Sequence, residues 1–339
     1  TNIGLEMMLW GKLNLTLDYY WERRKDILIQ RSSLPSMAGF DASIYANMGE
    51  MDNKGVDANL EYQTRIGNKV GLRLFGNLTY SKNKIVFRDE PAMQYAYQKS
   101  EGTRYGEFYG YIAEGYFQSE EEIKKSPRQM RELAPGDIKY KDLNDDGVID
   151  ANDQCYLGKS WFPSWSYGMG FNINYHNFDL ALFFQGVSDV SIMANGGSID
   201  TGNGDWGASG VGIVPFTGMG LNPSNVITKA LDRWTADNPR ADAWYPRMTA
   251  NATTNDNNYV NSTHWLKDGS YLRLKQASLG YTLENKKLMD KGIEYLYFYL
   301  SGQNLLTFSK FKLWDPELGS NGAKYPLSRM VTLGMRVSF

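Results

Sequence analysis

The sequence predicts an all-β protein whose antiparallel strands cross a membrane as part of a β-barrel. Three observations favour this fold class. Apolar and polar residues alternate with a period of two over long stretches, aromatic residues cluster at the ends of those stretches, and short and long connections alternate along the chain. Such alternation places one face of each strand in an apolar environment and the other face in water.

The alternation defines nine expected strands. In chain order they cover about 3–9, 13–22, 56–63, 72–81, 165–175, 178–185, 271–283, 295–300 and 331–339. The last strand shows the pattern most clearly, because every second residue from Val331 to Phe339 is apolar. Several stretches reach about 10 residues, whereas strands of globular proteins average about five or six. Their length and hydrated polar face favour lipid over the alternative, a soluble all-β domain or sandwich.

The connections provide an independent indication. Short ones at 11–12, 67–69, 176–177 and 284–294 alternate with long ones at about 30–52, 85–162, 187–268 and 307–327. Outer-membrane barrels have short periplasmic turns and longer extracellular loops, so we expect the long connections to be extracellular. Nine strands cannot close such a barrel, because an open edge leaves backbone amides unpaired in lipid. The chain also opens without a methionine or signal peptide, which indicates a processed or partial polypeptide.

Composition excludes several functional classes. The 36 basic and 38 acidic residues leave a formal net charge of −2, which does not favour nucleic-acid binding. Cys155 is the only cysteine, so neither an internal disulfide nor a thiolate metal cluster is expected. His176 and His264 are the only histidines, and no catalytic motif is found. We therefore expect no enzymatic activity and no organic cofactor.

One motif indicates a calcium site. Residues 142–153, DLNDDGVIDAND, place oxygen-bearing side chains at alternating positions of a twelve-residue loop, with Gly147 at the sharp turn. The flanking sequence reads as strands, so this is not an EF-hand. The expected ligands are Asp142, Asn144, Asp146, the Val148 carbonyl, Asp150 through water, and Asp153. The alternative is a surface turn that matches by coincidence.

Five blocks of sequence resemble the SusC/RagA family of TonB-dependent outer-membrane transporters. These blocks are residues 46–62, 108–123, 134–186, 301–317 and 325–339. They occur in the family's order and span essentially the whole chain. Siderophore and cobalamin receptors are the nearest alternative within the transporter class, but they lack these blocks.

The resemblance implies a location and a set of partners. The chain would supply about the last nine strands of a 22-stranded barrel in the bacterial outer membrane, crossing it many times. The plug domain, the energy-coupling box and the early strands have no counterpart among these 339 residues. Its partners would be lipid, the remaining barrel strands and plug, the TonB complex and a SusD-like surface lipoprotein. The cargo would be oligosaccharide or peptide, and the rival hypotheses are a passive porin and a soluble calcium-bearing carbohydrate-binding module.

The remaining candidate residues lie in the long connections and on the polar strand faces. We expect a helix at 224–238, capped by Ser224. Trp234 and Trp244 are expected in a loop core or at the lipoprotein interface, whereas Trp206 and Trp265 are weak candidates for substrate contact. Phe339 resembles the signal read by the barrel-assembly machinery. Polar residues expected to line a lumen are Asp57, Asn59, Arg73, Asn77, Asn172, Asn174 and Arg336.

Overall fold

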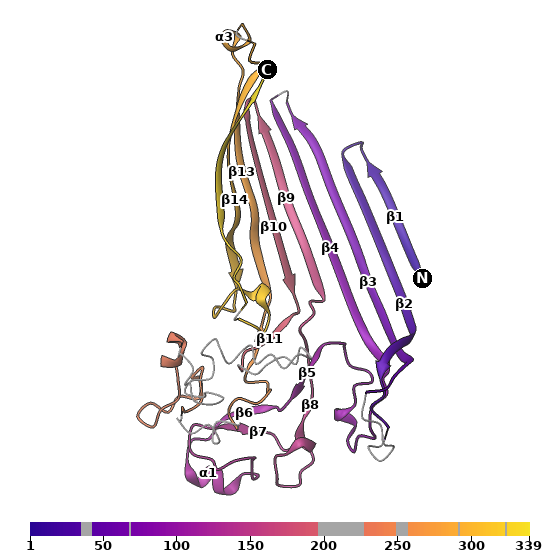
Figure 1. The fold of residues 1–339 in the computed structure, drawn as a ribbon, viewed down its shortest axis with the longest axis vertical. Coiled ribbons are helices and arrows are strands. Elements are labelled where there is room, and N and C mark those ends of the chain that lie inside the picture. Colours follow the sequence, from indigo (N-terminus) through magenta and orange to yellow (C-terminus); the bar gives the residue numbers. More distant parts are fainter. Residues whose placement is uncertain (35–42, 68, 196–226, 249–256, 291, 323) are drawn as a thin grey trace.

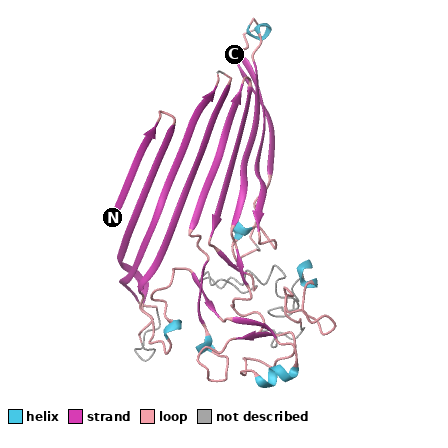
Figure 2. Ribbon diagram, turned by 180° about the vertical axis from the view of Figure 1, so that it is seen from behind, coloured by secondary structure: helices cyan, strands magenta, loops and turns pink. Residues whose placement is uncertain are grey.

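A single nine-stranded antiparallel sheet dominates the computed structural model of the chain (Figures 1 and 2). The structure describes residues 1–34, 43–67, 69–195, 227–248, 257–290, 292–322 and 324–339. Each strand pairs with the next one of the sheet in chain order, so every connection joins neighbours. The strands are β1 (Asn2–Leu9), β2 (Leu13–Gln30), β3 (Tyr45–Ile66), β4 (Val70–Phe87), β9 (Trp165–Tyr175), β10 (Phe178–Ser188), β13 (Tyr271–Leu283), β14 (Tyr295–Ser309) and β15 (Met330–Ser338).

The sheet confirms the predicted all-β class and corrects several strand ends. The strand expected at 56–63 runs from Tyr45 to Ile66, and its partner β2 continues to Gln30. Backbone pairing across β2 and β3 continues through polar sequence, with register shifts near Ile27. A ladder of backbone hydrogen bonds does not require alternating side chains, so periodicity alone underestimated these strands.

The apolar face of the sheet is exposed. Leu60 is 44% exposed, Leu279 49% and Leu300 48%, although all three lie in the middle of paired strands. In the described residues the remaining sheets have only two strands each, and the small sheets gather beyond one end of the large one (Figure 1). The sandwich alternative is therefore wrong, because a sandwich would bury these rows between two sheets.

Glycines on the polar face make room for aromatic rings of the neighbouring strand. A Cβ atom added at Gly280 would lie 2.6 Å from Cε2 of Tyr297, and one added at Gly334 would lie 2.6 Å from Cε1 of Tyr299. Gly280 pairs with Tyr299, and Tyr297 pairs with Thr282, two residues further along β13 on the same face. The rings thus fill the space that the missing side chains leave, which fixes strand register at these points.

The long connections fold together beyond the long-loop end of the sheet (Figure 2). They contain β5 (Glu107–Gly110), β6 (Ala113–Tyr116), β7 (Ile138–Tyr140), β8 (Cys155–Ser160), β11 (Ser191–Met193) and β12 (Leu266–Asp268). Among the described residues, the α-helices are α1 (Glu120–Lys125) and, in a short turn at the other end of the sheet, α3 (Lys286–Met289). The 3₁₀ helices of the same residues are η2 (Ala96–Gln98), η3 (Ala151–Asp153), η5 (Thr228–Leu231) and η6 (Pro316–Leu318). Among the described residues, no helix is long and apolar enough to span a membrane.

The helix expected at 224–238 is wrong over its described part. Ser224 lies outside the described residues, and η5 supplies only the 3₁₀ turn Thr228–Leu231. Beyond it, the Trp234 amide donates to the Tyr245 carbonyl and the Tyr245 amide donates to the Asp232 carbonyl. This tertiary pairing takes the backbone groups that a helix would have used, so local propensity was overridden.

Candidate functional site

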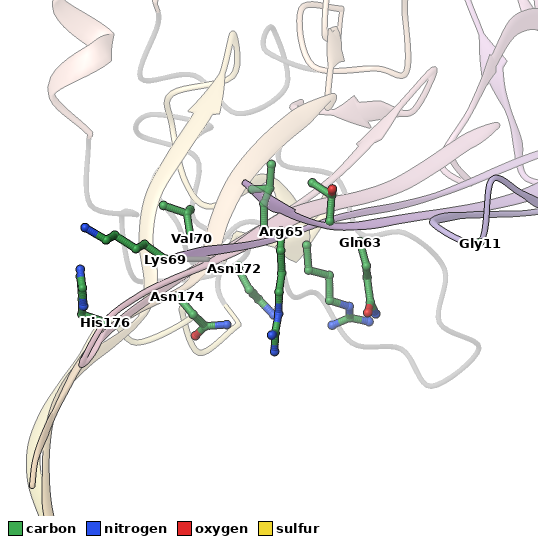
Figure 3. A pocket seen from close by; sticks show the side chains of 12 residues that line it. Gly11, Gln63, Arg65, Lys69, Val70, Asn172, Asn174 and His176 are labelled. Carbon is green, nitrogen blue, oxygen red and sulfur yellow. The ribbon is translucent and has the colours of Figure 1, made fainter. Parts of the chain in front are cut away.

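The polar face of the sheet carries two hollows. One, of about 700 Å³, lies near the short turns and is lined by Gln63, Arg65, Arg73, Asn172 and Asn174 among others. In Figure 3 the side chains of Gln63, Arg65, Asn172 and Asn174 leave the sheet on one side, while Val70 points away from them. The second, of about 610 Å³, includes Asp57, Asn59 and Asn77.

These hollows gather six of the seven expected lumen-lining residues. Arg73 is held in place by two hydrogen bonds to Glu61, of 2.9 Å each, while its guanidinium lies 4.8 Å from the centre of the Phe75 ring. The seventh residue, Arg336, lies 5.9 Å from the centre of the Tyr297 ring on β14. Amides and paired charges of this kind form a wall that water or a polar solute can contact.

The acidic loop is folded around its own backbone amides. Asp142 accepts from the Gly147 amide at 2.8 Å, and Asp146 accepts from the Val148 amide at 2.8 Å. The buried Asp153 accepts from the Leu143 amide at 2.7 Å and from the Asp150 amide at 2.9 Å. Asp145 and Gly147 both adopt positive φ, which creates the predicted sharp turn.

The fit of this loop to a cation is partial. The Oδ1 atom of Asp142 is buried and has no hydrogen-bond partner among the described residues, so it is free to coordinate a cation. In the described part of the chain, however, no three acidic, histidine or cysteine side chains converge as a ready ligand set. Carbonyl and amide oxygens, such as those expected from Val148 and Asn144, would have to complete the coordination shell. The calcium site stays a prediction.

Trp234 and Trp265 belong to the buried core of the loop region, and Trp244 packs against that core. Trp265 is completely buried and donates its indole N–H to the Asn258 carbonyl at 2.7 Å, so its ring is not available to a substrate. Trp234 is buried and packs against Gly136. Of the two tryptophans expected in the core or at the lipoprotein interface, only Trp244 keeps some exposed surface. Trp206 lies outside the described residues.

Buried charges tie the loops together. Asp137 is fully buried and accepts from Nη2 of Arg247 at 2.9 Å and from the Asn258 amide group at 2.8 Å. Asp315 and Glu317 do not face each other across a cleft. Instead, both pair with Arg273 on β13, at 2.6 Å and 3.4 Å. These pairs hold loop segments in position rather than forming an acid–base site.

Two further residues outside the sheet have shifted acidities. Burial raises the pKa of the Cys155 thiol, so the thiol stays protonated and unreactive. Burial, together with the charge of Lys267, lowers the pKa of His264 to about 4, although a bond to the Trp244 carbonyl opposes the shift. The sequence did not predict the role of His264, because no motif marks a histidine that packs into a loop core.

A comparison with protein families decides what kind of barrel this sheet belongs to. The family described as "TonB dependent receptor-like, beta-barrel" matches residues 1–305. This chain belongs to that family. The resemblance inferred from the five sequence blocks is thereby confirmed at the level of the barrel.

Named relatives and solved structures agree with this assignment. The chain is 27% identical to TonB-dependent receptor P3 of Formosa agariphila over its full length, covering 34% of that protein. It is 23% identical to TonB-dependent receptor SusC of Bacteroides thetaiotaomicron, covering 31%. The RagAB peptide importer in its closed-closed state superposes on the whole chain with a TM-score of 0.73 at 23% identity, covering 35% of the importer chain. The chain thus spans about a third of the length of the relatives it matches.

Proposed function

We propose that this chain is the C-terminal barrel portion of a transporter that imports a large nutrient across the bacterial outer membrane. The observation that carries the proposal is the membership of the TonB-dependent receptor family, combined with a sheet that exposes an apolar face and a polar face. The apolar face suits acyl chains, and the polar face, with its two hollows, suits a hydrated lumen. The plug and the remaining strands would come from the rest of the same protein.

The proposed partners follow from the relatives. One solved neighbour is the RagAB peptide importer, and one curated relative is SusC. We therefore place a SusD-like surface lipoprotein over the long loops and the TonB complex at the periplasmic side. The cargo would be a peptide or an oligosaccharide, and the chain would perform no covalent chemistry.

Nutrient uptake tests this function. Deleting the gene in the source bacterium should abolish growth on a peptide or oligosaccharide that requires import, and deleting tonB should have the same effect. The full-length protein should also co-purify with a surface lipoprotein. Uptake that persists without TonB would overturn the proposal in favour of a passive porin.

We also propose a structural calcium ion in the 142–153 loop. The buried, unpartnered Oδ1 of Asp142 supports it, and calcium would neutralise several carboxylates packed in one turn. Isothermal titration of the full-length protein should show calcium binding that Asp142→Asn weakens at least tenfold. Asp242→Asn, at an exposed aspartate outside the loop, is the control. Equal binding by the wild-type protein and the Asp142→Asn variant would exclude this site.

A further inference from the structure

A third hollow, of about 620 Å³, lies among the long connections, away from the sheet's polar face. Three segments distant in sequence supply most of its lining: residues 228–232 at η5, β12 and the residues 310–313 that follow β14. Trp244 is the one further lining residue. Four of its lining residues are lysines: Lys229, Lys267, Lys310 and Lys312. No sequence motif could have predicted this cluster, because only the fold brings the three segments together.

The charges in this lysine pocket do not cancel. Asp232 is bonded by Lys229 at 2.7 Å and also pairs with Arg240, while Asp268 accepts from the Ser270 amide at 2.9 Å. Within the described part of the chain, neither Lys310 nor Lys312 forms an ion pair. Two aspartates thus face four lysines, and the pocket attracts anions.

The position of Lys267 strengthens this field. Its ammonium group donates to the His264 carbonyl at 2.6 Å and lies 5.3 Å from the centre of the Trp244 ring. Burial, and then the neighbouring charge of Lys229, lower the pKa of Lys267. A half-buried ammonium group with a second cation nearby is stabilised by an incoming carboxylate.

The walls between the lysines are apolar. Leu231 is 76% exposed, Leu313 is half-buried, and Phe311 packs edge-on against Trp314 with ring centres 4.8 Å apart. Trp244 is the pocket's one further aromatic ring, and Lys267 already lies over it. A sugar would have to displace Lys267 to stack on that face, whereas an aliphatic side chain can pack against Leu231 and Leu313 directly.

We propose that the lysine pocket binds an acidic cargo peptide, with an apolar side chain against the leucines and a carboxylate among the lysines. The proposal rests on the proposed import function and specifies its cargo. It places initial capture of the peptide on loops that belong to this chain. The carboxylate is an Asp or Glu side chain rather than the peptide's own C-terminus, and an amidated peptide that keeps its Glu distinguishes these two sources.

Binding to the purified full-length protein in detergent tests the pocket without any energised transport. The probe is a fluorescent Leu–Glu hexapeptide, compared with versions in which Gln replaces Glu or the C-terminus is amidated. We expect the acidic peptide to bind at least tenfold more tightly than the Gln peptide. The double variant Lys310→Gln/Lys312→Gln should weaken that binding about tenfold and leave the Gln peptide unaffected.

The matched control is Lys286→Gln/Lys287→Gln, which removes the same charge from exposed lysines of α3 at the opposite end of the sheet. Equal affinity for acidic and Gln peptides, or an unchanged affinity in the pocket variant, would overturn the proposal. The proposal would also be overturned if the pocket variant lost affinity for an oligogalacturonate but kept its affinity for the peptide. The same holds if the variant lost only its binding to the lipoprotein. None of these outcomes affects TonB-dependent uptake, so the import function is tested separately.

Discussion

Arg273 shows how a single side chain couples the sheet to a loop. It is 1% exposed on β13 and makes two hydrogen bonds to Asp315, at 2.6 and 2.8 Å. The same guanidinium pairs with Glu317, which also accepts from the Tyr271 hydroxyl at 2.6 Å. The loop that follows β14 is therefore held to the large sheet by ion pairs, and a single guanidinium neutralises both carboxylates.

Replacing Arg273 by Met should destabilise the protein. Removing one partner leaves two partly buried carboxylates uncompensated, and we expect the free energy of unfolding to fall by about 2–3 kcal/mol. Urea unfolding of the full-length protein in detergent measures this change. Arg65→Met, at an exposed arginine of the polar face, is the control and should change the midpoint little. Equal midpoints for the two variants would show that the ion pairs do not anchor the loop.

His264 makes the loop core sensitive to acid. Its folded pKa of about 4 lies below the ordinary value near 6.5, so the unfolded chain binds the proton first as the pH falls. Stability is therefore fully present above about pH 6.5 and is lost towards pH 4, by up to about 3 kcal/mol. The hydrogen-exchange protection factors of residues 257–268, corrected for the intrinsic exchange rate at each pH, should fall as the pH is lowered across this window.

The two histidines of the chain provide a matched pair for this measurement. His264→Gln keeps a group that can donate to the Trp244 carbonyl, at 3.2 Å in the wild type, but it does not titrate. It should abolish the pH dependence between 6.5 and 4. His176→Gln, at the exposed β9–β10 turn, should leave it unchanged. Identical pH profiles for wild type and His264→Gln would refute the assignment.

At the scale of strands, glycine–tyrosine pairs set the register of the C-terminal hairpins. A Cβ at Gly280 would lie 2.2 Å from the Tyr297 hydroxyl oxygen and 2.4 Å from Oδ1 of Asp179. We expect Gly280→Ala to lower the free energy of unfolding by about 1–3 kcal/mol through overpacking. Gly71→Ala is the control, because its nearest neighbour would be the Asn174 Cβ at 3.6 Å. Heat-modifiable mobility on gels reports the folded fraction of both variants.

The period-two pattern predicted the existence and order of the strands but not their ends. Strand β9 alternates along its whole length and β10 at most of its positions, and their observed bounds lie within a few residues of the prediction. Strand β3 starts at Tyr45, well before the expected 56, because backbone pairing with β2 persists where side chains no longer alternate. The conformation of residues 227–238 could not be predicted either, since backbone hydrogen bonds join Tyr245 to Asp232 and Trp234, which are not local in sequence.

At the scale of the molecule, the sequence could predict surfaces but not pockets. Asn59, Asn77 and Asn172 were placed on the polar face by parity alone, and the hollows there include all three. The lysine pocket depends on how three segments of two long connections fold against one another, which no local pattern encodes. The burial of Trp265 has the same origin, because an aromatic residue in a long loop reads identically whether it packs inward or faces solvent.

The orientation of the two sheet faces is the property on which the transporter function depends, and one pair of neighbouring residues tests it. Leu60 lies on the apolar face of β3 and Asn59 on the polar face, and both side chains are exposed. Both residues pair with β2 on one side and with β4 on the other. The two arginine variants therefore differ in the face that they change and not in their backbone pairing. If lipid covers the apolar face, Leu60→Arg should cost about 2–4 kcal/mol of folding free energy, and Asn59→Arg less than about 1 kcal/mol. Urea titration of the full-length protein refolded into phosphatidylcholine bilayers measures both values. Equal losses of folding free energy in the two variants, or a larger loss for Asn59→Arg, would mean that the apolar face of this sheet does not contact acyl chains.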